Sequence, residues 1–334
     1  MNICVVTPAP GRSRKGNRVT ALRWARLLRE LGHRVAIEEK YRGQRCDLLI
    51  ALHARRSYDS IERFHRERRG RPLIVALTGT DLYGDIHTDP LAQRSLELAT
   101  RLILLQPAGI SELPERLRDK VRVIFQSATK PPGTFLPRRD VFEICVLGHL
   151  RPVKDPFRTA LAARLLPASS RIRVVQIGAA LEPEMEAQAC AEMAANRRYR
   201  WLGELPRWQA LRRLARSHLL SLTSLSEGGA NVISEALACG VPVVSSRISG
   251  SIGILGADYR GYFPVGDTAA LAALLERAER DRAFYQELKA WGERLRPLVD
   301  PARERETWDR VLRELPVSST PAAAMAGRGT VEVA

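Results

Sequence analysis

The clearest structural signal in this chain is the run Ser226-Glu227-Gly228-Gly229-Ala230-Asn231-Val232-Ile233-Ser234-Glu235-Ala236-Leu237-Ala238-Cys239-Gly240-Val241-Pro242-Val243-Val244-Ser245. An apolar strand ends before it, near Thr223, a glycine-rich turn follows, and a short helix begins near Ala230. In a parallel α/β sheet this order places free backbone N–H groups and the positive end of a helix at the carboxyl edge of the sheet. The run therefore predicts a diphosphate site.

The two glutamates of this run face different parts of one ligand. Glu227 lies in the turn, whereas Glu235 lies about one and a half turns into the predicted helix. Carboxylates cannot hold phosphate, but they accept hydrogen bonds from hydroxyl groups. We therefore expect Glu227 and Glu235 to bind the hydroxyls of a sugar and a ribose.

Outward from this run, short apolar segments alternate with helical patterns, which is typical of parallel α/β architecture. A first helix is predicted from the spacing of Ala21, Trp24, Ala25 and Leu28, and Gly32 is placed to end it. The predicted strands cover residues 3–7, 35–37, 48–52, 73–77, 102–105, 121–125, 142–147, 173–177, 218–223 and 241–245.

A Pro- and Gly-rich segment, residues 129–137, interrupts this alternation and predicts a linker. We expect a first α/β domain (1–130), a linker (131–140), a second α/β domain (141–300), a final helix (301–316) and a disordered Ala-, Ser- and Gly-rich tail (317–334). Asp300 and Pro301 predict the N-cap and first turn of the final helix.

A second motif follows the first strand of the second domain. It reads Gly148-His149-Leu150-Arg151-Pro152-Val153-Lys154, a loop whose cationic side chains would stabilise a departing diphosphate as negative charge develops.

The two motifs together resemble the retaining glycosyltransferases of the GT-B fold, over residues 141–315 and more weakly over 1–130. The resemblance implies two Rossmann-like α/β domains that face a central cleft, with the C-terminal helix returning to the first domain. It implies that Glu227 contacts the donor sugar, Glu235 the ribose and Lys154 the diphosphate. His149 stands where the family has an arginine, so we expect His149 to be catalytic beside Glu227 and Lys154, and Arg151 to compensate for the missing arginine. The other donor-binding residues that the resemblance implies are Gly228, Gly229, Ala230 and Asn231 near the sugar and diphosphate, and Gly203 and Leu205 near the base.

Three loops of the first domain lie at predicted strand ends and would face the same cleft. They cover residues 7–18, 53–56 and 78–81, and the first two carry the basic residues Arg12, Arg14, Lys15, Arg18, Arg55 and Arg56. Guanidinium groups and a helix start suit a small oxyanion. We expect the acceptor to be such an anion, bound by Lys15, Gly16, Asn17, Arg18, His53, Arg55, Thr80 and Asp81.

These loops, with the strings Leu52-His53-Ala54-Arg55-Arg56 and Leu77-Thr78-Gly79-Thr80-Asp81, resemble the selenosugar synthases of selenoneine biosynthesis. That resemblance implies that a nucleotide sugar, UDP-linked, is joined to selenophosphate through a carbon–selenium bond at the anomeric carbon. Because selenium in this acceptor is already anionic, it needs little help from a general base. The alternative is a GT-B enzyme that acts on a glycan, a lipid or a natural product.

Net charge, cysteine content and apolar segments indicate the compartment in which the protein works and whether it enters a membrane. The net charge is +16, and solvated arginine-rich helix faces account for most of it. The five cysteines form no CxxC pair, which predicts free thiols in a cytoplasmic protein. The first residues predict a strand and not a signal peptide, and no segment approaches the roughly 18–20 apolar residues of a membrane span.

No Asp-x-Asp pair stands out at a donor loop, so we expect no metal and no other cofactor. We also expect neither a nucleic-acid partner nor stable membrane insertion. Two other classes stay open at this point: a nucleotide-sugar epimerase on the same fold, and an anion- or nucleic-acid-binding module suggested by the positive charge.

Overall fold

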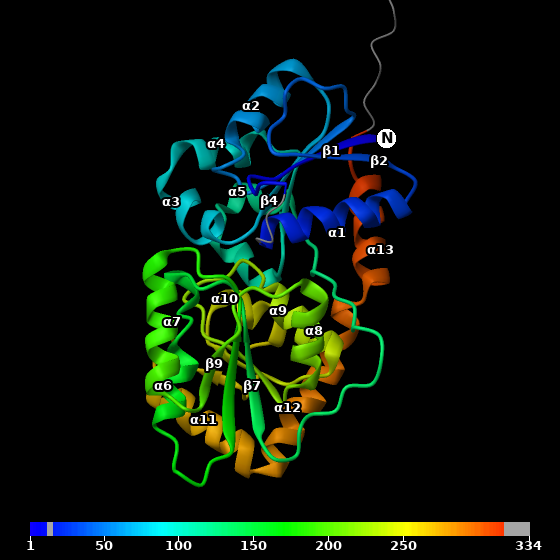
Figure 1. Cartoon of the computed structure of the whole chain (residues 1–334). Coiled ribbons are helices and arrows are strands. Elements are labelled where there is room, and N and C mark those ends of the chain that lie inside the picture. The colour runs from blue at the N-terminus through cyan, green and yellow to red at the C-terminus, as the bar shows by residue number, and fades with distance from the viewer. Residues whose placement is uncertain (12–15, 317–334) are drawn as a thin grey trace, which may run out of the picture.

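The computed structural model describes residues 1–11 and 16–316 and contains two parallel six-stranded sheets, one in each half of the chain (Figure 1). The first sheet has the order β2-β1-β3-β4-β5-β6 and the second β12-β11-β10-β7-β8-β9. The strands are β1 (Asn2–Val6), β2 (Arg34–Glu38), β3 (Leu48–Leu52), β4 (Leu73–Leu77), β5 (Arg101–Leu104), β6 (Val121–Val123), β7 (Phe142–Leu147), β8 (Ile172–Ile177), β9 (Tyr199–Trp201), β10 (Leu219–Leu222), β11 (Val243–Ser246) and β12 (Tyr262–Phe263). The predicted α/β fold is therefore confirmed.

The central strands are buried along their whole length. All five residues of β3 and of β4 are buried, because helices cover both faces of a parallel sheet. Two strands escape sequence prediction, β9 and β12, because they span only a few residues at the sheet edges, too short for any periodicity to show.

Each sheet has one place where the strand order reverses. In the first sheet β1 and β3 are neighbours, and in the second β7 and β10 are neighbours. Connections from such a pair leave in opposite directions, so a crevice opens at their carboxyl ends. The loops after β7 and β10 are the two motifs of the second domain, and the loops after β1 and β3 carry the basic segments of the first.

Helices flank the sheets. They are α1 (Gly16–Glu30), α2 (Tyr58–Glu67), η1 (Asp81–Asp85), α3 (Ile86–Thr88), α4 (Pro90–Leu98), η2 (Pro107–Glu112), α5 (Glu115–Arg118), η3 (Pro152–Lys154), α6 (Arg158–Arg164), α7 (Pro183–Ala195), α8 (Arg207–Arg216), α9 (Asn231–Cys239), α10 (Ser249–Leu255), α11 (Thr268–Arg280), α12 (Arg282–Leu295), η4 (Arg296–Val299) and α13 (Pro301–Arg313). None of these helices is both long and apolar enough to span a membrane.

The C-terminal helix α13 returns to the first domain, as predicted (Figure 1). The Asp300 carboxylate caps it by accepting a hydrogen bond of 2.7 Å from the backbone N–H of Ala302. Trp308 on α13 packs edge-to-face on Trp24 of α1, with ring centroids 4.9 Å apart, and both rings are fully buried. Such an aromatic pair contributes about 0.5–1.5 kcal/mol beyond its buried area.

The chain crosses between the domains twice. Residues 124–141 form the first crossing and contain no helix or strand; the predicted linker 131–140 lies inside it. The second crossing is the turn from η4 into α13. A hydrogen bond of 3.0 Å from the Ala128 N–H to the Val299 carbonyl ties the two crossings together. The predicted disordered tail 317–334 lies outside the described residues.

Candidate active site

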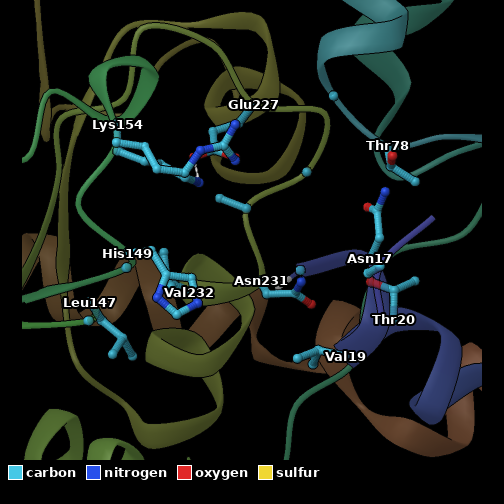
Figure 2. A pocket seen from close by; sticks show the side chains of 18 of the residues that line it. Asn17, Val19, Thr20, Thr78, Leu147, His149, Lys154, Glu227, Asn231 and Val232 are labelled. Carbon is cyan, nitrogen blue, oxygen red and sulfur yellow. Dashed lines mark hydrogen bonds and ion pairs between the residues drawn. The ribbon is translucent and has the colours of Figure 1, made fainter. Parts of the chain in front are cut away.

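A cavity of about 490 Å³ lies between the two domains. Figure 2 shows Lys154 and Glu227 on its second-domain wall and Asn17, Thr20 and Thr78 on the facing first-domain wall. Its lining also includes Gly16, Val19, His53, Arg56, Thr80, Gln126, Leu147, His149, Arg151, Leu205, Arg207, Gly229, Ala230, Asn231, Val232 and Glu235. The loops that follow β1, β3, β4, β7 and β10 thus meet in one place.

The glycine-rich turn lets the two domains approach closely. A Cβ atom on Gly228 would lie 2.5 Å from the carbonyl carbon of Thr78, and one on Gly229 would lie 2.5 Å from Cβ of Leu105. Only a residue without a side chain fits at such a separation. The turn therefore brings the start of α9 directly against the loops after β4 and β5 of the first domain.

Glu227 and Lys154 form an ion pair on the second-domain wall (Figure 2). The Ser224 hydroxyl donates a second hydrogen bond, of 2.7 Å, to the same Glu227 oxygen. Lys154 ends the short helix η3, and the Thr223 hydroxyl donates to its carbonyl at 3.1 Å. The loops after β7 and β10 are thereby joined, and a cation and a carboxylate stand side by side at the crevice.

Glu235 also lines the cavity and is buried within α9, with 5% of its side chain exposed. Arg207, the first residue of α8, reaches Glu235 with Nη1 at 2.7 Å from Oε1. Burial raises the pKa of the Glu235 carboxyl, and the charge of Arg207 opposes that rise. Leu205 and Gly203 were both predicted to lie near the base. Leu205 lines the cavity, whereas Gly203 does not.

His149 lines the cavity (Figure 2), and a backbone N–H group fixes the orientation of its ring. The backbone N–H of Ala179 donates to His149 Nδ1 at 3.2 Å, which assigns the ring proton of the neutral form to Nε2. The loop after β8 packs so tightly here that a Cβ on Gly178 would lie 2.0 Å from the Gly148 carbonyl oxygen. Arg151 also lines the cavity.

On the first-domain wall, Gly16 and Asn17 line the cavity at the start of α1. Arg18, on the next position of the helix, does not line it. Lys15, the remaining predicted residue of this loop, lies outside the described residues together with Arg12 and Arg14.

His53 has an unusual backbone conformation for a residue with a side chain, with φ at 73°. Burial lowers the pKa of His53, so the ring is neutral near pH 7. Its Nδ1 accepts from the Arg56 N–H at 3.3 Å, and its Nε2 then donates to the Thr80 hydroxyl at 3.1 Å. The Thr80 hydroxyl therefore keeps its own proton to donate within the cavity.

Two residues predicted to bind the acceptor lie elsewhere. Asp81 is fully buried and accepts hydrogen bonds from the backbone N–H groups of Ala54, Thr78 and Gly79, so it holds the two loops together. Arg55 points to α4, where it pairs with Asp89. Its neighbour Arg56 lines the cavity in its place.

Both Arg55 and Arg56 were predicted to lie at the cleft, with Arg55 as the acceptor contact, whereas Arg56 is the one that lines the cavity. Two residues that bear on the site were missed: Arg207, the partner of Glu235, and Gln126, which lines the cavity from the first crossing. Neither carries a local sequence signal. In the described part of the chain no three His, Cys, Asp or Glu residues are grouped so that they could hold a metal ion.

The chain resembles known proteins in sequence and in fold. Residues 134–296 match the family described as glycosyl transferases group 1. HepE from Anabaena, solved with UDP and glucose, has a TM-score of 0.73 at 16% identity and covers 94% of this chain and 100% of its own. Sucrose-phosphate synthase from Thermosynechococcus elongatus has a TM-score of 0.74 at 15% identity, with 94% and 98% covered. A UDP-forming α,α-trehalose-phosphate synthase from Burkholderia xenovorans has a TM-score of 0.66 at 14% identity, with 91% and 80% covered.

The structural likeness extends over both domains and identifies the GT-B fold, while the family match covers the domain that carries Lys154, Glu227 and Glu235. The chain thus has the GT-B fold, and residues 134–296 match the group 1 glycosyl transferases.

Proposed function

We propose that this enzyme transfers a sugar from a UDP-sugar to a small anionic acceptor, and that the acceptor is selenophosphate. The observation that carries the proposal is that the two domains line the cavity with different groups. The loops after β7 and β10 provide a wall with both acidic and basic side chains for the donor, and the first domain provides a wall with Arg56 and Thr80. A neutral acceptor gives no reason for a cationic side chain on that second wall.

The donor half of the proposal rests on the second-domain wall. The N-terminus of α9 and Lys154 suit a diphosphate, and Glu227 and Glu235 suit the hydroxyls of the sugar and the ribose. An ammonium has three N–H donors, so Lys154 can bind a phosphate oxygen while it remains paired with Glu227. The comparison structures solved with UDP and glucose support uridine as the base.

The acceptor half needs an anion to approach a site that already contains a diphosphate. Arg56 supplies positive charge, and the Thr80 hydroxyl and the Asn17 amide supply neutral donors. Selenium would form a bond to the anomeric carbon while the bond from that carbon to the diphosphate oxygen breaks, and UDP would leave with the electron pair. Lys154 would stabilise the charge on the leaving group.

A sugar phosphate is a second candidate acceptor. Two of the proteins with the same fold are named as synthases of sugar phosphates, sucrose-phosphate and trehalose-phosphate. A sugar phosphate shares the tetrahedral oxyanion that Arg56 would bind, and it differs from selenophosphate in its hydroxyl nucleophile and in the sugar ring that it carries.

Product analysis by mass spectrometry tests both candidates. The enzyme is incubated with UDP-, ADP- and GDP-sugars, each with selenophosphate, with glucose 6-phosphate and fructose 6-phosphate, or with glucose as a neutral acceptor. We expect a selenium-containing sugar and UDP only from a UDP-sugar with selenophosphate. Transfer to a sugar phosphate alone would select the second candidate, and preference for glucose would contradict an anionic acceptor.

A further inference from the structure

Arg23 of α1 links the two domains close to the cavity, although its side chain does not line the cavity. Its Nε lies 3.1 Å from the carboxylate of Glu304 on α13, and its Nη1 donates to Oδ1 of Asn231 at 2.9 Å. The side chain of Arg23 is 9% exposed and that of Glu304 is fully buried. One guanidinium therefore connects α13, α1 and the first residue of α9.

The Glu304 carboxylate is held in a single position by further donors. The indole N–H of Trp24 donates to Oε1 at 2.8 Å, and the backbone N–H of Ser127 donates to Oε2 at 2.8 Å. Within the described residues, however, Nη2 of Arg23 is buried without a hydrogen-bond partner. A buried charge with an unpaired donor costs free energy, so stability alone does not account for Arg23.

The contact with Arg23 decides which way the Asn231 amide points. A guanidinium has donors only, so the amide oxygen must face it and the amide nitrogen must face away. That nitrogen lies on the side of the first-domain loop: a Cβ on Gly16 would be 3.9 Å from Nδ2. Asn231 and Gly16 both line the cavity, and Figure 2 shows Asn231 between α9 and α1. The two N–H donors of Asn231 are thus presented at the cleft.

We propose that Arg23 is a positioning residue which orients the Asn231 amide so that its N–H donors bind a phosphate of the donor diphosphate. Glu304 fixes Arg23 for this task. The inference rests on the proposed function, because the phosphate is that of the nucleotide sugar. Without Arg23 the amide can turn its oxygen to the cleft, where it repels a phosphate oxygen. Since Arg23 belongs to the first domain, the donor site is complete only when both domains are together.

Isothermal titration calorimetry tests this role by measuring the affinity of the enzyme for three probes: UDP, inorganic pyrophosphate and uridine. Arg23→Met should weaken UDP and pyrophosphate roughly tenfold, about the effect of one charge-assisted hydrogen bond, and leave uridine binding unchanged. Asn231→Asp, which puts an anionic oxygen where the amide nitrogen was, should weaken both phosphate-bearing probes further. Arg26→Met is the matched control, because Arg26 is on the same helix, has 57% of its side chain exposed and pairs with Glu30 on the helix surface.

The double variant Arg23→Met/Asn231→Ala separates positioning from a general loss of structure. If Arg23 acts through Asn231, the double variant binds UDP as Asn231→Ala does alone. Equal weakening of uridine and UDP in Arg23→Met, or additive losses in the double variant, would overturn the positioning role and leave the proposed function standing. A wild-type enzyme that binds neither UDP nor pyrophosphate would instead contradict the proposed function itself. Should Arg23→Met fail to fold, Asn231→Asp and Asn231→Ala make the same comparison between the three probes.

Discussion

At the scale of single residues, the Glu227 carboxylate is the most informative group to alter, because both Lys154 and Ser224 bind it. Glu227→Gln keeps its size and removes its charge. We expect turnover to fall roughly tenfold to a hundredfold, since one contact to a charged group contributes about 1.5–3 kcal/mol. The free energy of unfolding should fall by only about 1 kcal/mol, because the amide oxygen of the glutamine can still accept hydrogen bonds from Lys154 and Ser224. Steady-state rates and thermal unfolding measure the two effects, and full turnover would contradict the donor-site role.

The adjacent arginines Arg55 and Arg56 form a natural pair for testing the acceptor wall. Arg56→Gln removes a charge from the cavity, whereas Arg55→Gln removes a charge that pairs with Asp89 outside it. We expect the KM for the anionic acceptor to rise about tenfold in Arg56→Gln alone, with the KM for the donor unchanged. Added salt should weaken acceptor use in the wild type and less so in Arg56→Gln. Equal effects of the two substitutions would exclude Arg56 as the acceptor contact.

Glu235 predicts a pH dependence of nucleotide binding. Burial raises the pKa of its carboxyl, so Glu235 takes up a proton at a higher pH than an exposed glutamate does. Its protonated form is a poorer acceptor for ribose hydroxyls, and UDP affinity should therefore fall as the pH drops through the raised pKa. Arg207→Met removes the charge that opposes this rise and should move the fall to higher pH. Titrations of the enzyme with UDP at several pH values test this prediction. Glu235→Gln, which cannot take up the proton, should not show the fall in UDP affinity.

At the scale of elements, the turn into α9 controls how closely the domains meet. Gly228→Ala would place a methyl group 2.5 Å from the Thr78 carbonyl carbon, so the domains must move apart. We expect kcat to fall at least roughly tenfold, because reacting groups on opposite walls lose their alignment. UDP affinity should also fall, because Arg23 of the first domain then no longer reaches Asn231. Gly84→Ala is the control, since nothing lies within 4 Å of a Cβ there. A kcat equal to that of the wild type would show that this close approach is not needed for transfer.

At the scale of the whole molecule, the enzyme should work without a divalent metal. The N-terminus of α9, Lys154 and Arg151 would provide the positive charge that a bound metal ion supplies in metal-dependent enzymes. We expect transfer rates in EDTA to equal those in magnesium or manganese. Activity that disappears on chelation and returns when the metal is restored would refute this prediction.

How far the sequence predicts the molecule depends on the range of the interaction concerned. Short-range periodicity predicts both sheets, the helix at Asn231 and the capped start of α13, because buried strands and helix ends impose local patterns. It cannot tell which of Arg55 and Arg56 faces the cavity, because that depends on Asp89, which is 34 residues from Arg55. Nor does it find the contact from Arg23 to Asn231, which joins positions 208 residues apart.

The hydrogen bond from Ala128 to Val299 has a mechanical consequence. Two crossings tied at this point would act as a hinge, so the domains would move most easily by rotating about an axis through it. Substrates and UDP would then enter and leave at the rim of the cleft farthest from this axis. Closure about this hinge would bring Gly228 onto Thr78 and Arg23 onto Asn231 together, because both contacts join the same two domains.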